Sequence, residues 1–336
     1  MTNPSLLKHN EMIFKKDGGF DFPIFFDYYE RAVASVWRHQ EVAMEADLRD
    51  WQGATNLERE IISGILKGFV TSELGIGSYW SNVVANLFPK PEIVSMARAF
   101  AFFEVIHSSA YSYLNDLLGL DEYEAFINDP IALQKVESFF QKVDPKVSLA
   151  LYSGGGEGVS LFCSFAVLLA FNLKGRFKGL AQIISWSARD EQCHSDGGCY
   201  LFRKLVEEVG ITSEEEQQIY EGMDLILQNE LAFIDSIFQG RDILELDPND
   251  LKSYIKVRTN MKLVELGLRP RKLSSEDIMR ANKISSWFDP MIEGASSNDF
   301  FTQSKDGNNY MSKISQKFTE VDLTTIRNEL DCLIAA

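Results

Sequence analysis

The sequence predicts an all-helical protein, built as a bundle of long α-helices around one core. Apolar residues recur at helical spacing through long segments of the chain, as on the buried face of an amphipathic helix. Proline is scarce, with 9 residues in 336, and most prolines fall between these segments. Few stretches alternate apolar and polar residues between turn signals, so little β-sheet is expected. Long helices suit a bundle whose interior is built from facing side chains.

Helices are expected in the intervals between the proline breaks. Pro91 is expected in the first turn of the third helix, where a proline costs no hydrogen bond because that N–H has no partner within the helix. Several segments are longer than the usual globular helix of about three turns. In chain order, the expected helices cover residues 24–40, 57–88, 91–118, 146–173, 178–209, 213–238 and 248–266.

The chain is expected to form one helical domain, residues 1–290, followed by a C-terminal tail, residues 291–336. The tail opens with the sequence GASSNDFFTQSKDGNNYMSK, which is polar and rich in turn-forming residues. Such a composition offers too little apolar surface to support a packed core. The last residues, DCLIAA, are apolar and follow a short amphipathic stretch.

Composition and targeting signals predict a cytoplasmic protein that binds neither membranes nor nucleic acids. The N-terminal sequence MTNPSLLKHNEMIFKKDGG lacks the apolar core of a signal peptide. The most apolar stretch, residues 159–173, is expected to be too short to span a bilayer and is interpreted as a buried helix. The four cysteines form no CxxC pair, which fits a reducing compartment. A formal net charge of −16 would repel a phosphate backbone.

Two segments repeat one chemical pattern, Glu-x-x-His. The first is formed by Glu104 and His107, the second by Glu191 and His194, so two of the 4 histidines lie in these pairs. Residues three apart share one face of a helix, so each pair can present a carboxylate and an imidazole to one point. One such pair arises by chance in many helices. Two pairs on long apolar helices indicate a site, because burying these groups without partners is costly.

A two-metal site in a bundle needs one further carboxylate from each of two other helices. Glu73 lies among apolar and small residues, and Glu157 is the only charge in a long apolar stretch. Each could instead be a helix-end or solvated glutamate. Carboxylate oxygens with imidazole suit iron or manganese, and paired metals can bridge an oxygen species. The glycines at 154–156 are expected to allow an irregular helix turn before Glu157.

Tyr111 follows His107 by four residues, one turn along the same helix face. Its phenol is therefore expected within about 10 Å of the metals. The other interpretation is an ordinary core tyrosine. Phe103, Phe162 and Phe165 are candidates for a dry wall that would protect a phenoxyl radical.

The motifs FFEVIHSSAY, ARDEQCH and a glutamate before GVSLFCSFA resemble those of the radical-generating beta subunit of class I ribonucleotide reductase, over nearly the whole chain. The resemblance implies a ferritin-like helical bundle, a homodimer and a catalytic alpha-subunit partner. It implies that the metal centre, activated by an oxygen species, stores an oxidising equivalent for reduction of ribonucleotides to deoxyribonucleotides. Tyr111 falls at the family's radical position. By resemblance, the metal ligands are Glu73, Glu104, His107, Glu157, Glu191 and His194.

The resemblance also implies a relay from the metal centre to the alpha subunit. It would begin at Trp37, in line with His107 and Asp190, with Asp190 hydrogen-bonded to His107 or Trp37. Taken alone, Trp37 would be interpreted as a core anchor. Tyr310 is the tail tyrosine and the candidate for the interfacial step. The last residues would dock into a groove of the alpha subunit as a short peptide.

The first ligand of most of the family is aspartate, whereas this chain has Glu73. Glutamate there is similar to the groups that use dimanganese or manganese–iron, so these two metal pairs are favoured over diiron. Two alternatives to the main interpretation remain open. One is a ferritin-like dimetal oxidase that acts on a small ligand without an alpha partner. The other is a metal-storage or scaffold protein that is not an enzyme.

Overall fold

The protein is all-helical, as predicted. The computed structural model describes residues 5–8, 19–120, 144–241 and 243–292, without the side chains of residues 70–75. Within these ranges the only β feature is an isolated bridge between Ile243 and Leu246. The α-helices are α1 (Pro23–Ala34), α2 (Glu45–Gly53), α3 (Asn56–Tyr79), α4 (Ala85–Leu87), α5 (Pro91–Leu118), α8 (Pro145–Ala150), α9 (Phe162–Leu173), α10 (Lys178–Val209), α11 (Ser213–Phe238), α12 (Pro248–Glu265) and α13 (Ser275–Ile292).

Local signals define the ends of the longest helices. The side chain of Thr55 accepts from the backbone N–H of Glu58, whose carboxylate accepts from the N–H of Thr55, so α3 begins with a capping box. Helix α5 begins at Pro91 and ends at Gly119, whose φ of 68° is a left-handed conformation that suits glycine. Helix α10 covers 32 residues and α5 covers 28, with the bounds predicted from the sequence.

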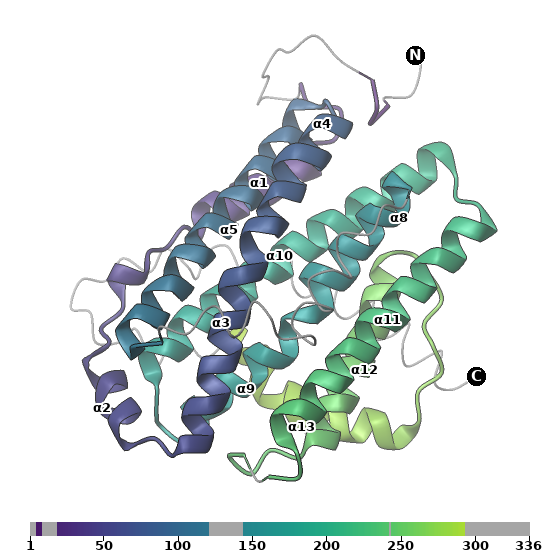
Figure 1. The fold of residues 1–336 in the computed structure, drawn as a ribbon. Coiled ribbons are helices and arrows are strands. Elements are labelled where there is room, and N and C mark those ends of the chain that lie inside the picture. Colours follow the sequence, from purple (N-terminus) through teal and green to yellow (C-terminus); the bar gives the residue numbers. More distant parts are fainter. Residues whose placement is uncertain (1–4, 9–18, 121–143, 242, 293–336) are drawn as a thin grey trace.

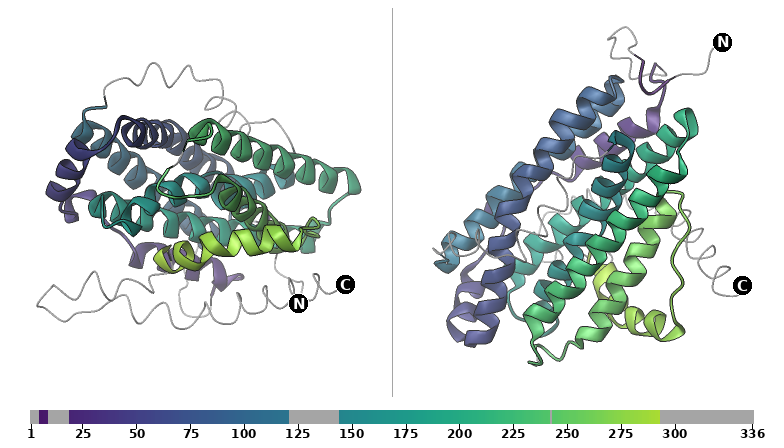
Figure 2. Two further views of the ribbon diagram at one scale, coloured as in Figure 1. Left: turned by 90° about the horizontal axis from the view of Figure 1, so that it is seen from below. Right: turned by 45° about the vertical axis from the view of Figure 1, so that its right-hand side comes forward.

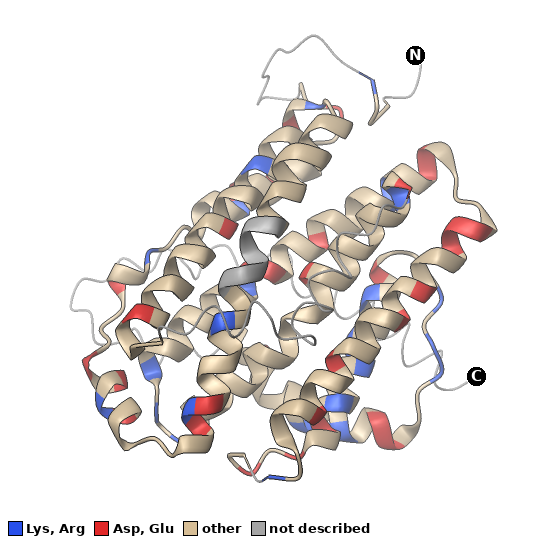
Figure 3. Cartoon of the chain, in the orientation of Figure 1, with Lys and Arg blue, Asp and Glu red and all other residues tan. Residues whose placement is uncertain are grey.

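The long helices lie side by side and slanted across the molecule (Figure 1). Helix α5 packs against both α1 and α3, and α10 packs along α8 and α9. Helices α12 and α13 pack against each other and close the bundle next to α11, as the two further views show (Figure 2). In the part of the chain that the structure describes, acidic and basic residues are interspersed along the ribbon (Figure 3). Buried apolar residues of all these helices pack into one core.

Two π-helical segments interrupt the regular helices. The first, Trp80–Val84, joins α3 to α4, and the second, Leu151–Ser160, joins α8 to α9 and contains Glu157. The irregular turn expected at the glycines is confirmed, although it extends over ten residues. A Cβ atom at Gly158 would lie 2.9 Å from the side chain of Lys262, so a larger residue could not pack this segment against α12. Glycine therefore lets the segment lie close to its neighbours.

The structure differs from the predicted elements in three places. The helix expected over residues 24–40 ends at Ala34, because the chain then turns to bury Trp37, which is 3% exposed. Helix α2 was not predicted, since its sequence is polar and Asp47 is its only buried residue. Helix α13 was also missed, and Pro290 lies inside its last turns rather than at a break.

The apolar segment from Pro145 to Leu173 is a core helix. Residues 159–173, expected to be a buried helix too short to span a bilayer, belong to one continuous stretch of 29 residues formed by α8, the π segment and α9, which has the length and composition of a membrane span. However, 89% of its most apolar window is buried inside the protein. Its hydrophobicity therefore reflects its place at the centre of the bundle. No other described helix has the length and composition of a membrane span.

Candidate metal centre

The two Glu-x-x-His turns face each other across the core. Glu104 and His107 lie on α5, and Glu191 and His194 lie on α10. His194 Nδ1 lies 2.9 Å from Glu104 Oε1 on the opposite helix and 3.4 Å from Glu191 Oε2 on its own. In the same way, His107 Nδ1 lies 2.9 Å from Glu191 Oε1. Each histidine thus faces the carboxylate of the other turn.

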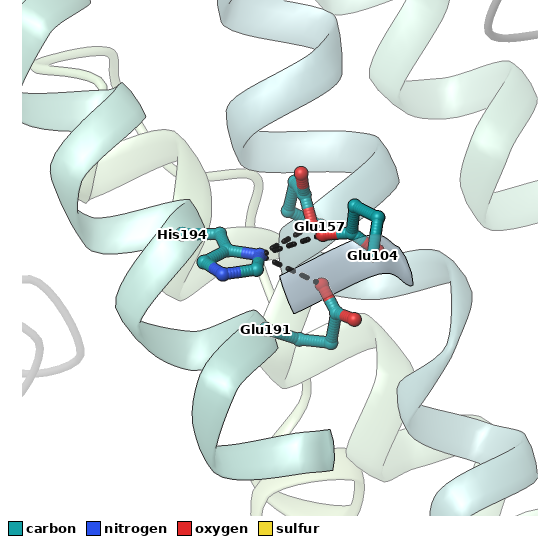
Figure 4. A group of neighbouring side chains, drawn as sticks. All are labelled: Glu104, Glu157, Glu191 and His194. Atoms are coloured by element: carbon teal, nitrogen blue, oxygen red, sulfur yellow. Dashed lines mark ion pairs between the residues drawn. The ribbon is translucent and has the colours of Figure 1, made fainter. Parts of the chain in front are cut away.

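Glu157 reaches the same point from the π-helical segment. Its Oε2 atom lies 3.6 Å from His194 Nδ1, and its Oε1 atom accepts a hydrogen bond from the indole N–H of Trp80. One ligand atom from each of Glu104, Glu157, Glu191 and His194 lies within 4.8 Å of the others, and Figure 4 shows these side chains converging. All four residues are at most 1% exposed. The cluster is sealed from solvent.

The donor set fits a metal ion. Within the described residues, neither carboxylate oxygen of Glu104 or Glu191 and neither ring nitrogen of His194 makes a well-aligned hydrogen bond. Buried polar atoms that lack such partners are costly and rare in folded proteins, so a bound cation is the natural partner for them. Burial and the adjacent charge of Glu191 raise the pKa of Glu157 to about 8. A divalent cation would remove this repulsion between carboxylates.

The predicted ligand Glu73 lies in α3, but its side chain is outside the described residues. Near Glu73, the backbone of α3 lies close to the cluster. Gly77, one turn after Glu73, is so close to α5 that a Cβ atom there would lie 3.0 Å from Cβ of Glu104. A fourth carboxylate from α3 remains a prediction.

Asp190 connects the cluster to Trp37. The indole N–H of Trp37 donates to Asp190 Oδ2 over 2.7 Å, and His107 Nε2 lies 3.2 Å from the same oxygen. Both expected hydrogen-bond partners of Asp190 are therefore present at once. The rings of Trp37 and His107 are stacked with centroids 5.9 Å apart. Trp186, which the sequence did not single out, lies with its ring centroid 5.3 Å from that of Trp37.

Tyr111 is fully buried beside the cluster, as expected. Its ring centroid lies 6.2 Å from that of His107. The ring of Phe69 packs on that of Tyr111, with 4.8 Å between their centroids, and this contact was not predicted. Phe165, one of the three expected wall residues, packs against Phe69, with 5.2 Å between the ring centroids.

The other two expected wall residues lie elsewhere around the centre. Phe103 faces both histidines, with centroids 6.4 Å from His107 and 6.1 Å from His194. Phe162 packs between Phe165 and Phe288. The walls of the site are aromatic, but spacing in the sequence did not identify which rings touch Tyr111.

Two further contacts were missed by sequence reasoning. Trp80 donates to Glu157, and Phe100 lies 4.4 Å from His194 between ring centroids. The only signal for Phe100 is its place one turn before Glu104 on the same helix face. Nothing local to Trp80 indicates that it meets a residue 77 positions later. Met291 and Ile292, expected as the start of the tail, are the last residues of α13, and Tyr310 and residues 293–336 lie outside the described residues.

Comparisons with known proteins show the family of this chain. Residues 19–271 match the family "Ribonucleotide reductase, small chain". A probable ribonucleoside-diphosphate reductase small subunit of Invertebrate iridescent virus 6 is 30% identical in an alignment of 295 positions that covers 74% of this chain and 82% of that one. The ribonucleoside-diphosphate reductase subunit beta of Chlamydia pneumoniae is 25% identical in an alignment of 272 positions that covers 73% of this chain and 78% of the relative.

Solved structures show the same fold. The R2 subunit of ribonucleotide reductase from Clostridium botulinum superposes with a TM-score of 0.70 and 19% identity, covering 80% of this chain and 88% of that one. The dimanganese(II)-NrdF of Streptococcus sanguinis superposes with a TM-score of 0.69 and 18% identity, covering 85% of this chain and 100% of the other. The expected ferritin-like bundle is confirmed. The chain belongs to the ribonucleotide reductase small chain family, whose members named above are subunits of an oxidoreductase.

Proposed function

We propose that this chain holds two metal ions and, once they are oxidised, supplies the oxidising equivalent with which a large subunit reduces ribonucleotides. The proposed ligands are Glu73, Glu104, His107, Glu157, Glu191 and His194. The observation that carries the proposal is the convergence of three buried carboxylates and two imidazoles at one dry point. Membership of the small chain family favours this function over an oxidase without a large subunit and over a storage protein.

When bound, the metal pair would supply the oxidising power that no amino-acid side chain of a resting protein provides. The residues of the chain bind it, exclude water from it and position the partners of electron transfer. Asp190 accepts from Trp37 and contacts His107 Nε2, so it holds both rings in fixed orientations. Burial alone would lower the pKa of His107, but its close contacts with the carboxylates of Asp190, Glu104 and Glu191 raise it. This hydrogen-bonded line is the proposed start of the relay.

Tyr111 is the proposed second store of the oxidising equivalent. Its ring is fully buried, lies 6.2 Å from that of His107 and packs against Phe69. A phenoxyl radical in such a place is shielded from solvent reductants. Tyr310 and residues 291–336 are the proposed continuation of the relay and the docking segment for the large subunit. Deleting the residues after Lys313 should weaken binding to the large subunit while metal content stays unchanged, and equal affinity would contradict the docking role.

The function is tested by reconstitution with the cognate large subunit. The metal-free chain is loaded with manganese or iron, oxidised, and mixed with the large subunit and a ribonucleoside diphosphate. Deoxyribonucleotide should form only when both subunits and the metal are present. A chain that binds two metals, becomes oxidised and still supports no reduction with its cognate partner would contradict the proposal.

We propose that the metal pair contains manganese. Two observations support this: the first proposed ligand is Glu73, and the fold is shared with a dimanganese(II)-NrdF. Carboxylate oxygens and imidazole bind manganese and iron alike, so geometry does not discriminate between them. Loading with both metals in equal amounts, followed by metal analysis and electron paramagnetic resonance, tests the choice. Recovery of iron alone would contradict it.

We also propose that the chain is a cytoplasmic homodimer, and that a second copy covers the outer face of α1 and α5. Val33, Val36 and Phe102 are about half exposed and line one groove of about 440 Å³, and Val105 continues the apolar surface one turn along α5. Exposed apolar patches of this kind mark protein interfaces. Replacing Phe102 with Glu should give a monomer in analytical ultracentrifugation. The control is Met279→Glu, at an exposed apolar position on α13.

A further inference from the structure

Three aromatic residues form a chain that starts at a proposed ligand and has no part in the relay through Trp37. These residues, Trp80, Tyr79 and Tyr152, are called the Trp80 cluster below. Trp80 is fully buried, and its indole N–H donates to Glu157. The ring of Tyr79 meets that of Trp80 edge to face at 6.1 Å between centroids. Tyr79 and Tyr152 are stacked nearly parallel, with centroids 3.7 Å apart and an angle of 10°.

The Trp80 cluster contains two phenol hydroxyls that packing alone does not require. Tyr79 is 7% exposed and Tyr152 is 3% exposed, so two phenol hydroxyls are taken out of water. Phenylalanine would fill the same space without that desolvation cost. Aromatic pairs also prefer offset or edge-to-face arrangements to a close parallel stack. Burial raises the pKa of both phenols, so both rings are neutral tyrosines at physiological pH.

Tryptophan and tyrosine are the side chains that most readily lose a single electron. In the Trp80 cluster they are in contact with each other, and Trp80 is joined to the candidate metal centre by one hydrogen bond. The hydroxyl of Ser148 donates to that of Tyr79 over 3.3 Å, and Ser148 is only half-buried. Rotation of the two hydroxyls would reverse this bond and give the phenolic proton of Tyr79 an exit. Electron and proton could therefore leave Tyr79 in different directions.

We propose that the Trp80 cluster is a second site for the oxidising equivalent, used when Tyr111 and the Trp37 relay do not accept it. This rests on the proposed function, which supplies the oxidised metal centre as the oxidant. Trp80 gives one electron to that centre along its hydrogen bond to Glu157. Tyr79 returns one electron to Trp80 and becomes a neutral phenoxyl radical. Its phenolic proton passes through the Ser148 hydroxyl to solvent.

The balance of this step is one electron gained by the metal centre and one electron and one proton lost by Tyr79. Tyr152 takes no proton or electron overall. Its ring lies parallel to that of Tyr79, so it stabilises the electron-poor ring by contact. The site would protect the metal ligands from their own oxidant when no large subunit is bound.

The test uses the full chain with Tyr111→Phe and Trp37→Phe, so that the other two proposed acceptors are removed. It is grown with ring-deuterated tyrosine or with ordinary tyrosine. The metal-free protein is loaded with ferrous iron and exposed to dioxygen, or with manganese(II) and exposed to superoxide, and frozen within seconds. Electron paramagnetic resonance should reveal an organic radical whose spectrum narrows on deuteration. Further replacement of Tyr79 and Tyr152 by Phe should abolish the tyrosyl signal.

The matched control is Tyr254→Phe, at a buried tyrosine on α12 outside the Trp80 cluster, which should leave the radical unchanged. Metal content, measured in every variant, identifies any that has lost the folded site. If the metals are oxidised and the radical is absent, or persists when Tyr79 and Tyr152 are both Phe, the inference is overturned while the proposed function stands. If the metal is oxidised neither with iron and dioxygen nor with manganese and superoxide, the proposed function fails and the inference fails with it.

Discussion

Replacing Glu157 with Gln should stabilise the metal-free protein at neutral and alkaline pH. Burial and the charge of Glu191 raise the pKa of Glu157 from an ordinary 4.5 to about 8. A carboxyl group whose pKa is raised by folding must take up a proton as the chain folds. The free energy of unfolding therefore falls as pH rises from about 4.5 to about 8, and this loss is absent below pH 4.5.

The size of this loss of stability follows from the difference between the ordinary and the raised pKa of Glu157. At about 1.4 kcal/mol per pH unit, the raised pKa of Glu157 costs roughly 3 to 4 kcal/mol of stability at pH 7 and about 5 kcal/mol above pH 8. Gln has the same shape and no charge, and its amide oxygen can still accept from Trp80. The variant should therefore be more stable than the wild type by about these amounts, with no difference at pH 4.

Urea unfolding in the presence of a chelator, repeated from pH 4 to pH 9, measures this difference. The control is Glu276→Gln, which removes a carboxylate that is 67% exposed on α13. With metal present, the wild type should be more stable than the Gln variant. Metal binding stabilises the native state, and the Gln amide is a poorer ligand than the Glu carboxylate. If the Gln variant is no more stable than the wild type at pH 8 in chelator, the carboxyl of Glu157 is not held in a dry, negatively charged site.

Three further predictions concern the same centre. His194→Ala should reduce the bound metal from two ions to at most one, since the ring faces carboxylates from two helices; a stoichiometry of two in metal analysis would count against the ligand set. Trp37→Phe removes the indole that donates to Asp190, so the metals should still be oxidised while nucleotide reduction with the large subunit is lost; surviving activity would mean that the relay starts elsewhere. Trp80→Phe removes the donor to Glu157 and should weaken metal binding about 10-fold in a chelator competition, as expected for a residue that orients a ligand, and unchanged affinity would show that Glu157 is held without it.

The sequence by itself determined the long core helices and the residue types of the site. Helical periodicity and Pro91 defined α5, because these signals act within a few residues of one another. Two Glu-x-x-His turns and the isolated charge of Glu157 in an apolar segment indicated a buried cluster. Burial of such groups demands partners, so the chemistry was readable before any contact was known.

Only the tertiary structure decided which helices face each other and which rings lie beside the cluster. The cross-helix pairing of His194 with Glu104, the hydrogen bond from Trp80 to Glu157 and the packing of Phe69 on Tyr111 join residues far apart in the chain. The end of α1 at Ala34 also depends on a contact between distant residues. Burying Trp37 against Asp190 stabilises the fold more than continuing the helix would. Local propensity is weak compared with the burial of a large aromatic ring, so contacts of this sort are fixed only when the whole core packs.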